Sequence, residues 1–597
     1  MCGISLLVNK TLSNAHFDDI HTMNETILHR GPDAGNTYVY NNVALGHRRL
    51  AIIDLSVDGE QPMHWKDKYT IIFNGEIYNY IEIKNDLESK GYIFSTKTDT
   101  EVILAAYDCY KEDCLNYFNG MWAFVIIDKQ SNSLFGARDR FGVKPFHYCI
   151  IDKYFACSSE IKQLLTIVPA VANEQIVVDF LSHGIVEHKE ETFFKSIFKL
   201  LPSTYFVYNL TSNKITFKKY YEILLRNEIL NYSLEESINV YEKTLESAIK
   251  LRMRSDVKVG TCLSGGLDSS TIAAIASKMS NGKFTAITAS STDKRNDETN
   301  FAKEVVQHCN LDWKTICPTT TVFFNNIAEI IKTQEEPFAS TSIFMQYFVM
   351  KSAKENGCTV LLDGQGGDET LFGYERYYAS LFKHLSFIDK IKTFRAATKN
   401  SKLTAKTLVA YLFYFNNFFI RKLFLKKRSA FLKPNYINKI DFSIIKDAIK
   451  SNNNVVNLQI LEITKTTMPQ LLKYEDRNSM RHSIETRLPF IDYNCVEVAL
   501  SINNNYKIYN GWTKYILRNI TQKHLPSSIA WRKNKVGFES PQDEWLKNKN
   551  YFLPLIKSSL LLKKITKTDF DFETISDNNL FWKLYCVAAW EKEFILK

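Results

Sequence analysis

The fold of the larger part of the chain is decided by Val257-Lys-Val-Gly-Thr-Cys-Leu263, which runs directly into Ser264-Gly-Gly-Leu-Asp-Ser-Ser270. The first segment is mostly apolar and predicts a strand, and Ser270–Met279 predicts a helix. Lys283–Ala289 is the next predicted strand. Strands that alternate with helices are typical of a parallel sheet, so we expect a doubly wound α/β domain that continues mainly as helix beyond Thr370.

The loop Ser264–Ser270 predicts a phosphate site between that strand and that helix. Gly265 and Gly266 allow successive N–H groups to turn toward one point, and the loop hydroxyls and the helix N-terminus add donors. The loop is not a Walker A motif, because the GxxxxGK[ST] spacing is absent. An ordinary Gly-Gly turn with a helix cap is the alternative, but the whole seven-residue pattern favours phosphate binding.

A second glycine-rich cluster reads Leu361-Leu-Asp-Gly-Gln-Gly-Gly-Asp-Glu369, followed by Phe372-Gly-Tyr374. An apolar strand there leads into glycines and carboxylates, at the end of a strand where open α/β folds bind ligands. Asp268 and Asp368 can together hold a Mg²⁺ ion that bridges nucleotide phosphates. A loop with a helix cap is again the alternative, and the presence of both clusters favours nucleotide binding.

The chain begins Met1-Cys2-Gly3-Ile4-Ser5. If Met1 is removed, the thiol of Cys2 lies beside its own α-amine, which places a nucleophile and a base on one residue. A structurally idle cysteine is the alternative.

Residues 1 to about 210 predict a β-rich domain with an α+β arrangement. Its predicted strands are Thr70–Phe73, Met121–Ile127, Leu134–Ala137 and Tyr205–Tyr208, with helices over Ile81–Leu87 and Glu101–Cys109. We expect a linker over Lys218–Asn231 and a helix over Leu234–Arg252.

Several polar residues of this first domain suit the recognition of an amino acid. Arg49 can pair bidentately with a carboxylate. Asn74 and Gly75 offer an amide and an N–H group to an oxyanion. Asp99 can receive an α-ammonium group. Each feature alone is ordinary turn chemistry.

Composition limits the classes of protein. With 597 residues, 45% hydrophobic and 23% charged, the chain predicts two or three folded domains. Its 11 cysteines include no CxxC pair, so a zinc site is not expected and a reducing compartment, the cytoplasm, fits best. No signal peptide and no membrane-spanning helix are expected.

The stretch Leu385–Asn435, here called the basic segment, holds many Lys and Arg and one acid, Asp389. Inside it an aromatic run, Leu408–Ile420, precedes a cluster of basic residues. Such a pattern is compatible with binding to a membrane surface or RNA. We expect instead a buried helix with a solvated basic end, and no nucleic-acid partner.

Together these residues resemble the glutamine-dependent asparagine synthetases, members of the class II (N-terminal nucleophile) glutamine amidotransferases. The resemblance runs from Cys2 to about Trp545 and is weakest between Leu385 and Ile460. Its motifs are Met1-Cys-Gly-Ile4, His29-Arg-Gly-Pro-Asp33, Asn74-Gly-Glu-Ile-Tyr-Asn79, Gly136-Ala-Arg-Asp139, Gly142-Val-Lys-Pro145, Ser264–Ser270, Asp363–Tyr374, Asp476-Arg-Asn-Ser-Met480 and Glu485-Thr-Arg-Leu-Pro-Phe490 with Asp492.

The resemblance implies a four-layer αββα glutaminase over residues 1–212. It implies an α/β synthetase domain of the PP-loop ATP pyrophosphatase type over residues 230–597, with a basic aromatic insertion near 385–460. Glutamine hydrolysis at Cys2 would supply ammonia to an aspartate that ATP activates as β-aspartyl-AMP. The products would be asparagine, glutamate, AMP and pyrophosphate, as expected of a carbon–nitrogen ligase. A homodimer is compatible with the resemblance.

The site residues follow from the same resemblance. Catalysis of glutamine hydrolysis is assigned to Cys2, Asn74 and Gly75, and glutamine binding to Arg49, Asn74, Gly75, Glu76 and Asp99. ATP binding is assigned to Leu263, Ser264, Gly265, Gly266, Asp268, Ser269, Ser270, Ile287, Asp363, Gly364, Tyr374 and Lys514. The acceptor site is assigned to Gln365, Asp368, Glu369 and Asp476, with Mg²⁺ on Asp268 and Asp368.

One position departs from the family pattern. Many asparagine synthetases carry Glu where this chain has Gln365, and Gln cannot take a proton. An alternative is therefore an amidotransferase that transfers glutamine nitrogen to another carboxylate, such as a uronic acid of a surface polysaccharide. A scaffold without activity is disfavoured by the intact Cys2, Asn74, Asp268 and Asp368.

Overall fold

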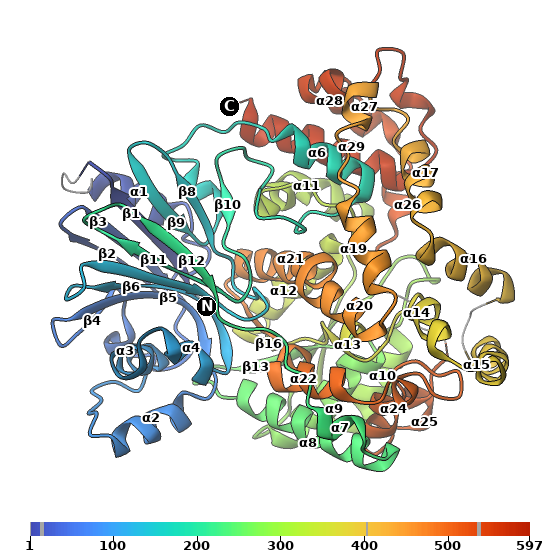
Figure 1. The fold of residues 1–597 in the computed structure, drawn as a ribbon, viewed down its shortest axis with the longest axis horizontal. Helices are drawn as coiled ribbons and strands as arrows, with labels where there is room; N and C mark the ends of the chain where they lie inside the picture. Colours follow the sequence, from blue (N-terminus) through green and yellow to red (C-terminus); the bar gives the residue numbers. More distant parts are fainter. Residues whose placement is uncertain (1, 12–16, 401–403, 534–538, 597) are drawn as a thin grey trace.

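The computed structural model describes residues 2–11, 17–400, 404–533 and 539–596. Figure 1 shows a part rich in strands on the left and a larger, mainly helical part on the right. The domain bounds expected from the sequence, 1–212 and 230–597, stay a prediction.

Two antiparallel sheets form the core of the first part, each with six strands, in the orders β10-β8-β9-β1-β3-β2 and β12-β11-β7-β6-β5-β4. The first sheet consists of β1 (Gly3–Asn9), β2 (Ala34–Tyr40), β3 (Val43–Arg49), β8 (His147–Ile150), β9 (Tyr154–Ser158) and β10 (Phe198–Lys199). The second consists of β4 (Met63–Trp65), β5 (Tyr69–Ile77), β6 (Gly120–Asp128), β7 (Ser133–Arg138), β11 (Thr204–Asn209) and β12 (Ile215–Lys219). All four strands predicted from the sequence lie within these strands.

The two sheets pack face to face because apolar residues alternate along their strands. Ile4 and Leu6 of β1 contact the same buried cluster as Ile72 of β5 and Val125 of β6. Helices α1 (Phe17–Glu25) and α5 (Ile161–Leu164) cover the outer face of the first sheet, while α2 (Tyr80–Ser89) and α3 (Asp99–Tyr110) cover that of the second. The expected four-layer αββα arrangement is confirmed.

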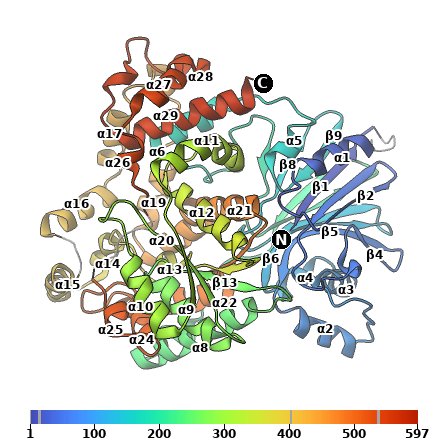
Figure 2. The same ribbon diagram turned by 180° about the vertical axis from the view of Figure 1, so that it is seen from behind.

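The second part is built on a parallel sheet of five strands in the order β15-β14-β13-β16-β17. Its strands are β13 (Val259–Cys262), β14 (Thr285–Ala289), β15 (Asp312–Ile316), β16 (Val360–Leu362) and β17 (Glu485–Arg487). Helices α8 (Leu234–Arg252) and α9 (Leu267–Met279) pack on one face and α12 (Ser342–Glu355) on the other, as Figure 2 shows from behind. The predicted α/β sheet with extra helices is confirmed.

The observed bounds of α8 are those predicted. Ser233 caps the helix, since its hydroxyl accepts the N–H of Glu236 while the Glu236 carboxylate accepts the N–H of Ser233. The expected linker Lys218–Asn231 instead holds the end of β12 and the one-turn helix α7 (Asn227–Leu230).

Most of the remaining helices surround the parallel sheet or extend from it, while the first of them packs beside α3 in the first part. They are α4 (Cys114–Tyr117), α6 (Glu174–His183), α10 (Thr299–Cys309), α11 (Thr320–Gln334), α13 (Gly367–Thr370), α14 (Tyr377–His384), α18 (Pro434–Ile437), α19 (Ser443–Ser451), α20 (Val455–Leu461), α21 (Met468–Arg481), α22 (Tyr493–Ser501), α23 (Asn504–Lys507), α24 (Tyr515–Gln522), α25 (Ser527–Ala530), α26 (Gln542–Trp545), α27 (Lys549–Ser558), α28 (Leu560–Ile565) and α29 (Asn578–Trp590).

The basic segment forms three helices, α15 (Phe387–Asn400), α16 (Ala405–Asn416) and α17 (Phe418–Arg428). The expectation of a buried helix is wrong here: Leu408 is the buried residue of α16, and α17 has none. No single helix among the described residues is long and apolar enough to cross a membrane, and α16 and α17 meet that criterion only as a pair bent by 96°.

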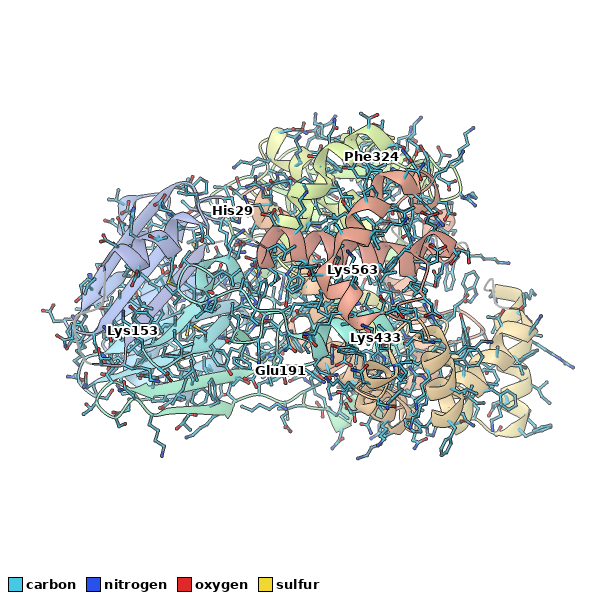
Figure 3. All side chains as sticks on the ribbon, turned by 90° about the horizontal axis from the view of Figure 1, so that it is seen from above. His29, Lys153, Glu191, Phe324, Lys433 and Lys563 are labelled. Carbon is cyan, nitrogen blue, oxygen red and sulfur yellow. The ribbon has the colours of Figure 1, made fainter. Side chains whose placement is uncertain are left out.

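The two parts meet through buried ion pairs. In Figure 3, His29 is labelled at the boundary between them. Glu335 follows α11 and accepts the N–H groups of Ile161, at 2.9 Å, and Lys162, at 2.8 Å. Its carboxylate also lies 2.7 Å from the guanidinium of Arg477 on α21. Glu335 therefore fixes helix α5 of the first part against helices α11 and α21 of the second.

Replacing this carboxylate should loosen the junction. We expect Glu335→Ala to lower the free energy of unfolding by about 3 kcal/mol or more, because a buried guanidinium loses a partner and two N–H groups lose their acceptor. Glu329→Ala on the same helix is the control: its pair with Arg481 is more than one third exposed, so we expect a loss below about 1 kcal/mol. Denaturant unfolding checks both, and equal losses would contradict this role of Glu335.

Candidate active sites

Cys2 lies immediately before β1, with 8% of its surface exposed. Its N–H group donates to Oδ1 of Asn74 at 3.1 Å, and its carbonyl accepts from Nε of Arg30 at 3.0 Å. Burial raises the pKa of the Cys2 thiol, so the thiol is protonated at neutral pH and needs a base to become a nucleophile. Met1, whose removal would free the α-amine, lies outside the described residues.

Asn74 and Gly75 lie side by side on β5, next to Cys2. The side chain of Asn74 is fully buried, and its Nδ2 finds no hydrogen-bond partner among the described residues. Gly75 tolerates no side chain, because a Cβ atom there would clash with the carbonyl oxygen of Met121. A buried donor without an acceptor beside a nucleophile is the geometry that an oxyanion requires.

Two buried carboxylates, Glu76 and Asp99, complete this site, and both have raised pKa values. Burial is the main cause that raises the pKa of Asp99 to about 7 and that of Glu76 well above its usual value; neighbouring carboxylates add to it. Asp99 accepts the N–H of Ile77 at 2.8 Å. A cation bound between them would be strongly favoured, so they suit the ammonium group of an amino acid.

Glu485 belongs to a motif of the sequence but was not predicted for this site. In the structure its charge raises the pKa of Glu76, although it belongs to β17 of the other part. Arg487 links the two, with Nε 2.5 Å from Glu485 and Nη2 3.8 Å from Glu76. No local pattern in the sequence indicates that pairing, because more than 400 residues separate the carboxylates.

Arg49 ends β3 and is nearly buried. Its guanidinium donates to the carbonyl oxygen of Ser56 at 2.6 Å and to that of Asp54. Arg49 thus shapes the loop that follows, and its contact with a ligand carboxylate stays a prediction.

The Ser264–Ser270 loop joins β13 to α9, as predicted. The hydroxyls of Ser264 and Ser269 lie 3.1 Å apart, and the N–H of Gly266 donates to the Ser264 hydroxyl at 3.2 Å. Gly265 has a φ of 78° and packs against the backbone of Ala302, which excludes a side chain. The loop therefore places its hydroxyls at the N-terminus of α9, a favourable position for phosphate.

Asp268 and Asp368, one hundred residues apart in the sequence, both contact one cation. Nζ of Lys514 lies 2.7 and 2.5 Å from the two carboxylate oxygens of Asp268 and 2.6 Å from Oδ1 of Asp368. Burial lowers the pKa of Lys514, but the two carboxylates outweigh burial and raise it. Gly373 lies so close that a Cβ atom would clash with Asp368. The two predicted glycine-rich clusters thus form one site.

The donor set around Lys514 fits a hard cation. Two carboxylates that converge on one positive charge offer the oxygen ligands that Mg²⁺ prefers, and phosphate oxygens would supply the rest. The described residues also contain one group of three metal-type ligands elsewhere, Glu242, Glu246 and His524. Lys523 contacts Glu242 at 2.5 Å and already supplies a positive charge there.

Glu369 is buried beside Asp368 and accepts the hydroxyl of Tyr374 at 2.6 Å. Burial and then the charge of Asp368 raise its pKa to about 7. A carboxyl group with such a pKa can accept or release a proton at neutral pH. Gln365, in the loop between Asp363 and Gly366, is partly exposed and offers no titrating group.

The residues assigned to the adenylate from the sequence lie on or just after the three inner strands of the parallel sheet, β13, β14 and β16. Leu263 donates its N–H to the carbonyl of Ile287 at 2.9 Å, and Gly364 packs on Asp268. Glu475 was not predicted for this region. It is buried beside Asp363, and burial together with that carboxyl raises its pKa well above the usual value.

Asp476 was expected in the acceptor site, but the structure places it at the junction. Both carboxylate oxygens accept from Arg30, at 2.8 and 3.1 Å, and the same guanidinium lies 2.9 Å from Glu160. Arg30 also holds the carbonyl of Cys2, as described above. Asp476 is therefore connected, through Arg30, to the backbone carbonyl of Cys2.

A buried cysteine beside an unpartnered buried amide nitrogen in one part, and a glycine-rich and serine-rich loop with two converging carboxylates in the other, fit the class of glutamine-dependent amidating enzymes. Residues 1–221 match the glutamine amidotransferase domain, and residues 240–583 match asparagine synthase. The chain belongs to the asparagine synthase family.

Three relatives illustrate how far the similarity extends. Asparagine synthetase (glutamine-hydrolyzing) 1 of Bacillus subtilis is 32% identical, over 92% of this chain and 88% of its own length. A putative asparagine synthetase 2 of Methanocaldococcus jannaschii is 35% identical over 68% of this chain and 81% of its own. Asparagine synthetase 3 of Bacillus subtilis is 28% identical over 94% and 90%. The similarity covers both sites, so the chain is a carbon–nitrogen ligase that uses glutamine.

The role of the Asn74 amide can be tested directly. We expect Asn74→Ala to lower kcat for glutamine hydrolysis about 10²–10³-fold, because one buried oxyanion donor is lost. Asn79→Ala, which removes an amide that donates to the carbonyl of Tyr117 at 2.9 Å, should change kcat by no more than about twofold. Steady-state glutaminase assays decide, and a loss confined to KM would contradict the assignment.

Proposed function

We propose that the enzyme synthesises asparagine, with glutamine as nitrogen donor and aspartate as acceptor. The observation that carries this proposal is the pair of sites in one chain: Cys2 beside Asn74, whose Nδ2 has no partner among the described residues, and the Lys514 cation between Asp268 and Asp368 at the Ser264–Ser270 loop. The names of the three relatives support aspartate as the acceptor.

In the glutaminase site, the sulfur of Cys2 attacks the side-chain amide carbon of glutamine. The α-amine of Cys2 takes the thiol proton and passes it to the leaving nitrogen, so that ammonia leaves and a glutamyl thioester forms. Nδ2 of Asn74 and the N–H of Gly75 bind the oxyanion. Water then releases glutamate. Substrate binding falls to Arg49, which pairs with the carboxylate, and to Glu76 and Asp99, which pair with the ammonium.

In the synthetase site, the side-chain carboxylate of aspartate attacks the α-phosphorus of ATP, and pyrophosphate leaves. The backbone around Leu263, Ile287 and Gly364 would bind the adenylate, while the Ser264–Ser270 loop and Lys514 would bind the phosphates. Asp268 and Asp368 would hold Mg²⁺, which when bound neutralises part of the charge of the leaving group. Ammonia from the first site then attacks the activated carbonyl, and AMP leaves.

The attacking ammonia must lose a proton, and Gln365 cannot take it. Glu369 is the better candidate, because its carboxyl is buried beside Asp368 with a pKa of about 7. We assign Asp476 a positioning role at the junction rather than contact with the acceptor, since Arg30 occupies both of its oxygens.

Removal of the thiol should separate the two half-reactions. We expect Cys2→Ala to abolish glutamine-dependent synthesis while ammonium chloride still supports it, because the ATP site lies in the other part of the chain. Cys317→Ala, at an exposed thiol, is the matched control and should retain both activities. Loss of both activities in a folded Cys2→Ala protein would contradict the two-site model.

Removal of one carboxylate at Lys514 should stop ATP cleavage. Asp268→Asn should lower aspartate-dependent pyrophosphate release at least ~10³-fold and leave glutaminase activity intact, because a charged contact to the phosphates or Mg²⁺ is lost. Asp447→Asn, which changes an exposed partner of Lys465, should leave both activities unchanged. Release of ADP and phosphate would refute the adenylate mechanism. Pyrophosphate release with a uronic acid but not with aspartate would refute aspartate as the acceptor.

A further inference from the structure

The basic segment accounts for the net positive charge of the chain. Residues 385–435 contain twelve Lys and Arg and one acid, while the net charge of the entire chain is +10, so the remainder is close to neutral. Of these basic residues, Arg428 is the one that forms an ion pair among the described residues, 3.8 Å from Asp577. The segment therefore presents a concentrated charge that the protein itself does not neutralise.

The same segment exposes large apolar side chains. Four of the five exposed phenylalanines among the described side chains lie here, namely Phe387, Phe413, Phe419 and Phe424. Phe413 is 66%, Phe419 80% and Leu423 70% exposed. Soluble surfaces rarely gather so many exposed aromatic groups without a binding role.

The exposed groups are arranged along helix faces. On α17, Phe419 and Leu423 are four residues apart and lie on one face, with Lys426 and Lys427 in the following turn. On α16, Val409 and Phe413 repeat the same spacing. Each helix therefore shows an apolar ridge, and that of α17 has several cations in the following turn.

The protein body fixes these faces outward. Leu408 on α16 and Leu425 on α17 pack into the buried clusters, and α17 rests on α6 and α19. Figures 1 and 2 show α15, α16 and α17 together along one edge of the molecule, and in Figure 3 the sheets that hold Lys153 lie at the opposite end. A flat partner can therefore reach the segment without approaching the glutaminase sheets.

The pair α16–α17 is not built to cross a bilayer. Asn417 is extended between the helices and caps α17, since its Oδ1 accepts the N–H of Ile420 at 3.0 Å, and the resulting bend is 96°. Five basic residues within α17 would also have to enter the hydrocarbon core, at a large cost for each. Helices of this composition lie in the plane of the membrane surface instead.

We propose that the basic segment docks the enzyme onto the surface of an anionic lipid bilayer. Lys and Arg would pair with lipid phosphates, while the Phe and Leu ridges would insert at the boundary between headgroups and acyl chains. The charge of the segment is complementary to such a surface. A second copy of the chain fits worse, because two such segments would repel each other, and a nucleic acid would leave the apolar ridges in water.

The test uses the purified full chain and vesicle flotation. Vesicles of phosphatidylcholine alone are compared with vesicles that contain roughly 30% phosphatidylglycerol. We expect binding to the anionic vesicles only, and a steep fall in binding between about 0.05 and 0.5 M salt, because screening removes the attraction.

Two double variants separate charge from insertion. Lys426→Glu with Lys427→Glu, and Phe419→Ser with Leu423→Ser, should each lower partitioning onto anionic vesicles on the order of tenfold or more. Matched controls are Lys214→Glu with Lys218→Glu on exposed positions near β12, and Ile93→Ser, where the side chain is 84% exposed. The control variants should bind within about twofold of wild type. All variants should keep glutaminase activity, and that activity serves as the evidence that they are folded.

The proposal is overturned if wild type fails to float with anionic vesicles at low salt, or if it binds both vesicle types equally. It is also overturned if the charge and ridge variants bind as well as the controls. A dimer in sedimentation analysis that the same variants dissociate would assign the face to a second copy of the chain instead.

Discussion

Arg30 is the ion on which the arrangement of both sites depends. It is fully buried. Its guanidinium contacts two carboxylates, Glu160 and Asp476, and the carbonyl of Cys2. Burial lowers the pKa of Arg30, but the carboxylates outweigh burial, and they leave it permanently charged. An isolated ion could not remain in such a place, so the three partners must be present together.

The pKa of Asp476 shows the same balance from the other side. Burial raises it, but Arg30, with smaller contributions from Lys144 and Arg477, lowers it by more, and the net shift is downward. A carboxylate with a depressed pKa stabilises the fold above its unfolded pKa of about 4, and that stabilisation is lost as the pH falls through the lower value. The junction between the two parts is therefore complete at neutral pH and weakens only in acid.

This junction also explains why neither site is independent of the other part. Glu485 and Arg487 of β17 reach the carboxylates that would bind the substrate ammonium, and α21 carries Glu475 beside Asp363 as well as Asp476 beside Arg30. Two neighbouring residues of α21 thus face the two candidate sites, Asp476 through Arg30 to the carbonyl of Cys2 and Glu475 beside Asp363 after β16. Movement of α21 would disturb both sites at once.

The features that were predicted correctly from the sequence are those that depend on neighbouring residues. The cap of α8, the strand before Ser264 and the two glycine clusters were predictable, because turn chemistry and apolar periodicity are local. The partners of Lys514 and Arg30 were not, since pairing across hundreds of residues leaves no local signal. The aromatic run in α16 was misjudged because high hydrophobicity alone does not distinguish a buried helix from one that rests on the surface.

The central claim is that nitrogen released at Cys2 reaches an acceptor activated at the Ser264–Ser270 loop of the same chain. The most direct measurement supplies amide-¹⁵N glutamine, aspartate, ATP and Mg²⁺ in the presence of unlabelled ammonium, and follows the product by mass spectrometry. We predict asparagine in which the side-chain nitrogen carries far more ¹⁵N than the ammonium of the medium. Asparagine with the isotope content of the medium, or no amidated aspartate despite glutamine hydrolysis, would contradict the account.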